Sequence, residues 1–158
     1  MKKIIIKSCL ILFFFITSNC GFKVLDNSDL NNFTIKEINS SGDRRSNFII
    51  KNNLLQNSSR NSHNILSINL ETNKIKNTIE RNLKKEITKN EIILHSNIEI
   101  YLINKNKQYK INHSVSGDYL VKDSYAATLS VEGKVTKNLA NNIANKILKD
   151  INLIFNDL

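Results

Sequence analysis

Apolar and polar residues alternate along two stretches in the second half of the chain, residues 92–103 and 109–121. One face of the first stretch carries Ile92, Leu94, Ile98, Ile100 and Leu102, interrupted by Ser96. One face of the second carries Tyr109, Ile111, His113, Val115, Gly117, Tyr119 and Val121. A period of two is typical of a half-buried β-strand. Because a short Lys/Asn-rich turn, residues 104–108, separates the stretches, they predict a β-hairpin.

The C-terminal part of the chain changes to a helical period. Its apolar residues recur every three or four positions and form one stripe: Leu139, Ala140, Ile143, Ala144, Ile147, Leu148, Ile151, Ile154 and Phe155. This spacing predicts a long amphipathic helix, with Asp123 or Ser124 as its N-cap and Gly133 inside it. Such a stripe has to be buried, and the apolar face of the hairpin is the obvious surface to cover it.

The first half of the chain predicts a strand, a helix and another strand. Residues 33–38 alternate as a short strand, and residues 40–43 are expected to be a loop whose Ser41 or Asp43 caps a helix over 44–56. Within that helix, Ile50 and Leu54 share one face, as do Phe48 and Leu55. A polar connector over 57–64 leads to a strand over 66–70, where Leu and Ile alternate with Ser and Asn.

Residues 72–89 allow two interpretations. Ile75, Ile79, Leu83 and Ile87 recur every four residues, which favours a helix. The segment also lies between predicted strands, so it can equally be strand and loop, as the extended arm of a hairpin. The second interpretation gives the order βαβββα. It predicts an α+β fold with a single mixed sheet of about four strands and two helices packed on one of its faces.

The N-terminus is typical of an export signal. Lys2 and Lys3 precede a mostly apolar run over 4–16, which is too short to span a membrane. The four residues 17–20, Thr-Ser-Asn-Cys, resemble a bacterial lipobox, so residues 1–19 are expected to be a lipoprotein signal peptide and Cys20 the acylated first residue of the mature chain. An ordinary signal with an incidental cysteine, or an uncleaved anchor, are the alternatives. Gly21 instead of Asp after the cysteine implies sorting to the outer membrane.

The mature part of the chain is basic. The formal charge is +9, and subtracting Lys2, Lys3 and Lys7 leaves +6 from Cys20 onward. A basic surface attracts anionic lipid, acidic glycolipid or nucleic acid, and export argues against nucleic acid as a partner. A lysine-rich composition that simply keeps the surface solvated explains the charge equally well.

The titratable residues form no recognisable catalytic or metal-binding motif. His63, His95 and His113 are not at ligand spacing, and both cysteines, Cys9 and Cys20, lie near the N-terminus. Gly133-Lys134 lacks the upstream glycine of a phosphate-binding loop. We therefore expect no metal, no cofactor and no enzymatic activity.

Several short segments together resemble LptE, the lipopolysaccharide-assembly lipoprotein, in its alphaproteobacterial form. Cys20-Gly21-Phe22 is similar to the start of the mature family members, and residues 50–54 are similar to a Leu-Arg-Asn-x-Leu helix segment. Thr88-Lys89 stands where the family has Thr-Arg before a long strand, and residues 124–126 and 139–144 are similar to the beginning and middle of its last helix. Lys51 and Lys89 replace arginines, which weakens bidentate phosphate binding there.

The resemblance implies an LptE-like domain over 20–158 and favours strand and loop over 72–89. It also implies a protein anchored by lipid (palmitate and similar acyl chains) on the periplasmic face of the outer membrane, which plugs an LptD-type β-barrel and assists lipopolysaccharide assembly. Anionic lipid A phosphates then suggest Lys89, Lys105, Lys107 and Lys110 as lipopolysaccharide contacts. The competing interpretations are an unrelated lipid-anchored envelope transport auxiliary or scaffold, and a periplasmic hydrolase.

Overall fold

The computed structural model describes residues 33–60 and 62–156, so the predicted signal peptide and Cys20 lie outside the described residues. The elements follow in the order β1 (Phe33–Gly42), α2 (Arg44–Gln56), β2 (Asn64–Arg81), β3 (Ile87–Leu102), the short 3-10 turn η2 (Ile103–Lys105), β4 (Lys107–Leu120) and α3 (Tyr125–Asn156). The predicted order βαβββα is confirmed.

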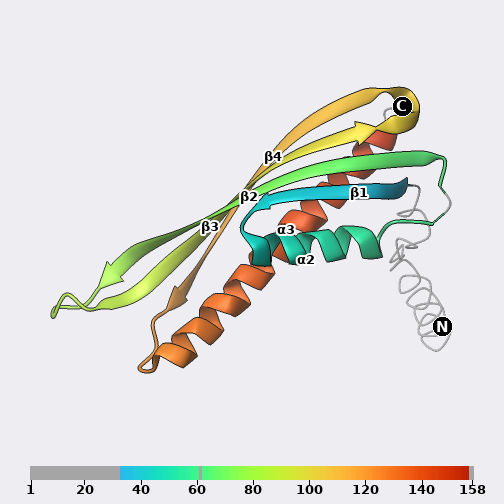
Figure 1. Cartoon of the computed structure of the whole chain (residues 1–158). Helices are drawn as coiled ribbons and strands as arrows, with labels where there is room; N and C mark the ends of the chain where they lie inside the picture. The colour runs from blue at the N-terminus through green and yellow to red at the C-terminus, as the bar shows by residue number, and fades with distance from the viewer. Residues whose placement is uncertain (1–32, 61, 157–158) are drawn as a thin grey trace, which may run out of the picture.

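One four-stranded sheet has the spatial order β1-β2-β3-β4. β1 pairs parallel with β2 across the α2 connection, whereas β2–β3 and β3–β4 are antiparallel. Both helices lie on the same side of this sheet, with α2 near β1 and the longer α3 crossing beneath β4 (Figure 1). The prediction of a mixed sheet with two helices on one face is therefore confirmed. No helix formed by residues 33–60 or 62–156 lies on the other face.

The core lies between the sheet and the two helices. Every second residue of β3 from Asn90 to Leu102 is buried, as the alternation of residues 92–103 predicted. Ser96, the polar interruption in that row, is 1% exposed and shares a 3.0 Å hydrogen bond with the Thr72 hydroxyl. Each buried hydroxyl thus satisfies the other, which removes the cost of an unpaired polar group in the core.

The two helix starts follow the predicted capping chemistry. The Asp43 carboxylate accepts a 2.8 Å hydrogen bond from the Ser46 amide at the start of α2. The Ser124 hydroxyl accepts a 3.1 Å bond from the Ala127 amide at the start of α3. These bonds satisfy amides that have no partner within the helix itself. Ser124 and Asp43 are therefore the residues that fix where the helices begin.

The two apolar pairs of α2 differ in burial. Ile50 and Leu54 are fully buried against the sheet, but Phe48 is 67% exposed and Leu55 is 42% exposed.

The prediction of a loop over 40–43 is wrong for its first three residues, because β1 continues to Gly42. Gly42 pairs with Thr72 and adopts φ +91°, a conformation that glycine reaches at no steric cost.

Beyond the end of β1, the β2–β3 hairpin continues as an arm, defined here as residues 73–95 (Figure 1). The strand-and-loop interpretation of residues 72–89 is confirmed, because β2 runs to Arg81 and β3 begins at Ile87. Ile75, Ile79, Leu83 and Ile87 are all exposed there. Their four-residue spacing therefore does not mark a buried helical face.

Candidate functional site

The lysines expected to contact lipopolysaccharide lie at two ends of the sheet. Lys89 is near the start of β3, whereas Lys105, Lys107 and Lys110 surround the β3–β4 turn. Thirteen residues of extended strand separate Lys89 from Leu102, or about 43 Å at 3.3 Å per residue. The structure brings the three turn lysines together but does not bring Lys89 to them, so the four cannot contact one phosphate group.

Two of these four lysines already have acidic partners. Lys89 forms an ion pair with Asp118 on β4, and this hydrogen-bonded partner raises the pKa of Lys89 above its usual range. Lys110 pairs with Glu99 across β3 and β4, with 2.8 Å between Nζ and Oε1. Among the described residues, no acidic side chain is within ion-pair distance of Lys105 or Lys107. These two lysines are therefore the best placed to meet an external anion at the turn.

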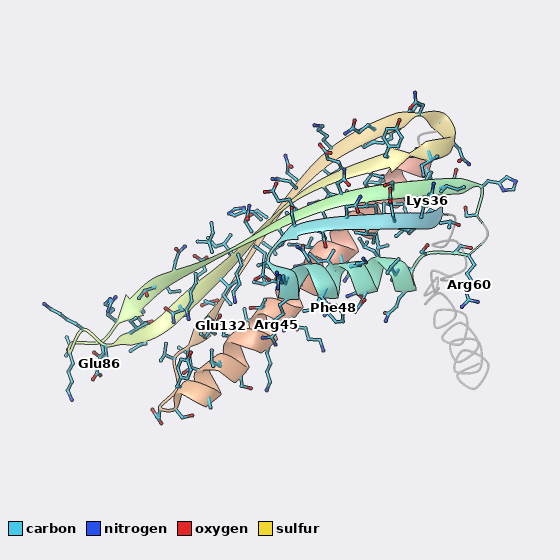
Figure 2. All side chains as sticks on the ribbon, viewed as in Figure 1. Lys36, Arg45, Phe48, Arg60, Glu86 and Glu132 are labelled. Carbon is cyan, nitrogen blue, oxygen red and sulfur yellow. The ribbon has the colours of Figure 1, made fainter. Side chains whose placement is uncertain are left out.

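A second group of cations at the tip of the arm was not predicted. Arg81, Lys84 and Lys85 lie around the β2–β3 turn beside Leu83, whose side chain is fully exposed. Figure 2 labels Glu86 at this tip of the arm. The Asn82 side chain holds this turn by accepting hydrogen bonds from the amides of Lys84 and Glu86. The two sequential lysines were a visible signal, but it became interpretable only once residues 72–89 were known to form a hairpin.

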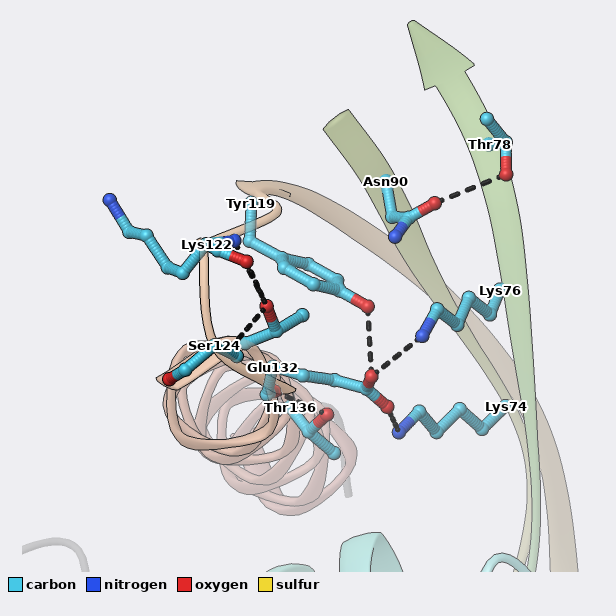
Figure 3. Close-up of polar contacts among 10 residues, drawn as sticks. Lys74, Lys76, Thr78, Asn90, Tyr119, Lys122, Ser124, Glu132 and Thr136 are labelled. Atoms are coloured by element: carbon cyan, nitrogen blue, oxygen red, sulfur yellow. Dashed lines mark hydrogen bonds and ion pairs between the residues drawn. The ribbon is translucent and has the colours of Figure 1, made fainter. Parts of the chain in front are cut away.

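The strongest electrostatic cluster joins the arm to α3 (Figure 3). Glu132 receives Lys74 Nζ at 2.8 Å on one carboxylate oxygen, and Lys76 Nζ at 2.9 Å and the Tyr119 hydroxyl at 2.8 Å on the other. Burial raises the pKa of Glu132, but the hydrogen bonds from Lys74, Lys76 and Tyr119 outweigh it and lower the pKa to about 2. The Glu132 carboxylate is thus ionised throughout the physiological range.

The pKa of Lys76 shifts in the direction opposite to that of Glu132. The hydrogen bond to Glu132 raises the pKa of Lys76 well above its usual range. Its ammonium group also lies 5.6 Å from the centre of the Tyr119 ring, within cation–π distance. Lys74, Lys76 and Tyr119 each donate to the same carboxylate, so the cluster ties the arm and β4 to α3.

His113 is part of another contact between the sheet and α3. Its Nε2 lies 2.6 Å from an Asp150 carboxylate oxygen, and the pair borders a surface hollow of about 420 Å³. The lining of this hollow is completed by Tyr109, Lys110, Ile111, Leu153 and Ile154. His95 is exposed on the uncovered face. The His113–Asp150 pair is thus a polar link between β4 and α3.

Within residues 33–60 and 62–156, no group of three or more His, Cys, Asp or Glu side chains is arranged to hold a metal ion. In the same part of the chain, none of the helices is both long enough and apolar enough to cross a membrane.

The sheet face opposite the helices is uncovered among the described residues, and it presents amides, hydroxyls and paired charges. A hollow of about 430 Å³ on that face is lined by residues such as Asn39, Asn69, Glu71 and Asn97.

Comparison with solved structures identifies the fold. Rare lipoprotein B from Shewanella oneidensis superposes with a TM-score of 0.59 at 14% identity, over 77% of this chain and 97% of that one. Lipoprotein B from Nitrosomonas europaea gives a TM-score of 0.55 at 9% identity, over 79% and 88%. A protein from Caulobacter crescentus gives 0.53 at 14% identity, over 83% and 95%.

This chain therefore has an LptE-like lipoprotein fold, that of rare lipoprotein B. No family model matches its sequence, and no curated protein matches it either. At identities of 9–14% the likeness is one of architecture, and it does not carry over the role of any single lysine.

Proposed function

We propose that this chain is a lipid-anchored envelope protein that occupies an LptD-type β-barrel and assists lipopolysaccharide assembly at the outer membrane. The observation that carries the proposal is the shared fold, which spans nearly the whole length of rare lipoprotein B. The lipobox-like residues 17–20 and the Cys20-Gly21-Phe22 start add an independent sequence argument for the anchor. A chain acylated at Cys20 would be held on the periplasmic face of the membrane without a spanning helix.

The uncovered sheet face supports this role. A wide barrel has a polar interior, so a protein seated inside it needs a broad polar surface. Asn, Ser, His and charged side chains provide that surface along the body of the sheet, and pairs such as Glu99–Lys110 keep its charges balanced. The other face is already buried under α2 and α3, so it is not available to a partner.

The basic turn between β3 and β4 supports contact with a phosphorylated lipid. Lys105 and Lys107 are exposed within three residues of each other, next to Asn106 in a left-handed conformation. Two ammonium groups on a tight turn suit a phosphate group, which accepts charge-assisted hydrogen bonds. Lys89 and Lys110 would contribute less, because Asp118 and Glu99 already neutralise them.

Affinity purification of the tagged full chain from gently solubilised membranes tests the proposal. We expect one large outer-membrane barrel protein to be recovered in constant proportion. The Cys20→Ser variant is the control for anchoring, and we expect it in the soluble periplasmic fraction or as an uncleaved precursor. Recovery of a transporter component without any barrel would instead favour the envelope-auxiliary alternative.

A further inference from the structure

A groove on the helical side of the molecule has no role in the proposed function. It has a volume of about 370 Å³ and lies between the end of α2 and the C-terminal half of α3. Its lining consists of Asn57 from the end of α2 and five residues of α3, namely Asn145, Leu148, Lys149, Asn152 and Leu153. Leu153 is 50% exposed, so part of its apolar surface faces solvent.

The chemistry of this groove fits an extended peptide. Asn145 and Asn152 are seven residues apart, two turns along the same face of α3. Within residues 33–60 and 62–156, neither of these side-chain amides forms a hydrogen bond. An asparagine amide can donate to one peptide carbonyl and accept from one peptide N–H. Leu148 and Leu153 lie beside these amides and can cover apolar side chains of the same peptide.

We propose that this groove binds the segment between the lipidation site and β1, residues 21–32 of the same chain. The segment joins the described fold at Phe33, whose ring stacks on Phe155 with 6.3 Å between centroids. Phe155 lies ten residues beyond Asn145, about 15 Å along α3 at 1.5 Å per residue. Twelve residues reach about 40 Å when extended, so residues 21–32 can follow the groove over its full length.

The composition of the segment matches the lining. Phe22, Val24, Leu25 and Leu30 provide apolar side chains among polar ones. Asp26 and Asp29 provide carboxylates for Lys149, the cation of the groove. A purely flexible tether needs no such spaced apolar residues, because Gly/Ser-rich sequence serves that purpose. Burial of two of these side chains would offset the entropy lost when the segment becomes ordered.

Docking of this segment would set how the domain sits at the membrane. This effect on orientation rests on the proposed lipid anchor at Cys20. The docking of residues 21–32 in the groove does not depend on that anchor. If the twelve-residue segment were free, the domain could rotate and could lie at any distance up to about 40 Å from the lipid. A docked segment holds the C-terminal half of α3 toward the anchor and points the uncovered sheet face in one direction. The protein would then meet its barrel already oriented.

Hydrogen exchange of the full chain in detergent micelles, followed by mass spectrometry, tests the docking. We expect the amides of residues 21–32 to exchange at least tenfold more slowly than in an unstructured peptide. Leu153→Ser should abolish this protection. The matched control is Leu129→Ser, because Leu129 is 45% exposed and lies near the other end of α3. This variant should leave the protection of residues 21–32 unchanged. Exchange of residues 21–32 at unstructured rates in the unmodified chain would overturn the proposal.

A photoreactive residue at position 153 gives a second readout. We expect its main crosslink to lie within residues 21–32, and a crosslink to a different protein would contradict the proposal. Both measurements can be repeated on Cys20→Ser, which lacks the acylated thiol. Protection in that variant supports docking even if no barrel is recovered, so failure of this inference and failure of the proposed function give different results.

Discussion

Protonation of Glu132 should weaken the attachment of the arm to α3. Its carboxylate receives three hydrogen bonds, and its pKa of about 2 in the folded protein compares with 4.5 for an unperturbed Glu. Since the folded-state pKa is depressed, the stabilisation is fully present above about pH 4.5 and is lost as the pH falls toward 2. That difference corresponds to about 3 kcal/mol at 1.36 kcal/mol per pKa unit.

The net effect should be smaller, because Lys76 is 46% exposed and solvent screens its interaction with Glu132. We therefore expect the Glu132 cluster to contribute about 1–2 kcal/mol to the free energy of unfolding at pH 7. Glu132→Gln keeps the shape of the side chain and removes its charge. Urea unfolding of this variant and of the wild type, followed by circular dichroism, should differ by that amount at pH 7.

The pH series distinguishes this cluster from general acid denaturation. Between pH 5 and pH 2.5, the stability of the wild type should fall toward that of Glu132→Gln, and the gap between them should narrow. Glu91→Gln is the control, since Glu91 lies on the uncovered face away from Glu132 and α3. A gap between wild type and Glu132→Gln that stays constant over this range would refute the assigned role of the Glu132 carboxylate.

Three further variants test other parts of the structure. Gly42→Ala should lower the free energy of unfolding, measured in urea, by about 3 kcal/mol. The reasons are that φ is +91° and that the new Cβ would lie 2.1 Å from the Thr72 backbone oxygen on β2. A loss below about 1 kcal/mol would contradict this. Gly133→Ala should raise stability by about 1 kcal/mol through helix propensity, since its Cβ meets only the movable end of an arginine side chain; thermal unfolding at an unchanged or lower temperature would refute it. Replacing Lys105 and Lys107 together by Ala should weaken binding to lipopolysaccharide vesicles by about tenfold or more, whereas Lys89→Ala should have a smaller effect, and equal losses would contradict the distinction between free and paired lysines.

The elements with a strong period could be predicted from the sequence. The alternation over 92–103 and 109–121 and the apolar stripe from Leu139 onward each predict one buried face. The structure buries the faces of β3 and α3 almost completely, and on β4 it buries Val115 and Tyr119 and half-buries the rest of the face. The caps at Asp43 and Ser124 were also predictable, because a short polar side chain before a helix has a specific partner. The number and order of elements depended in addition on the strand-and-loop interpretation of residues 72–89, which the family resemblance favoured over the helical spacing.

The sequence was a poorer guide where tertiary contacts decide the structure. Residues 72–89 have helical spacing, yet they extend a hairpin because β3 supplies the backbone partners for β2. The loop expected at residues 40–42 is strand for the same reason, since it pairs with Glu71 and Thr72. Phe48 and Leu55 were grouped on one face of α2 by their spacing, but the sheet covers only the face that carries Ile50 and Leu54.

The candidate site was only partly accessible from sequence. Lysines near a polar turn were identifiable, but their pairing with Glu99 or Asp118 depends on strand register. The Glu132 cluster combines residues 56 and 58 positions apart, so no local pattern could reveal it. The groove on α3 likewise depends on how two helices pack.

Photocrosslinking from the uncovered sheet face tests the central claim most directly. A photoreactive residue in place of Asn97 or Asn112, both exposed on that face, should crosslink in living cells to one large outer-membrane barrel protein. The same residue in place of Phe48, exposed on the outer side of α2, should give a different adduct pattern or a weaker one. Adducts from Asn97 and Asn112 only with soluble or inner-membrane proteins would contradict the account.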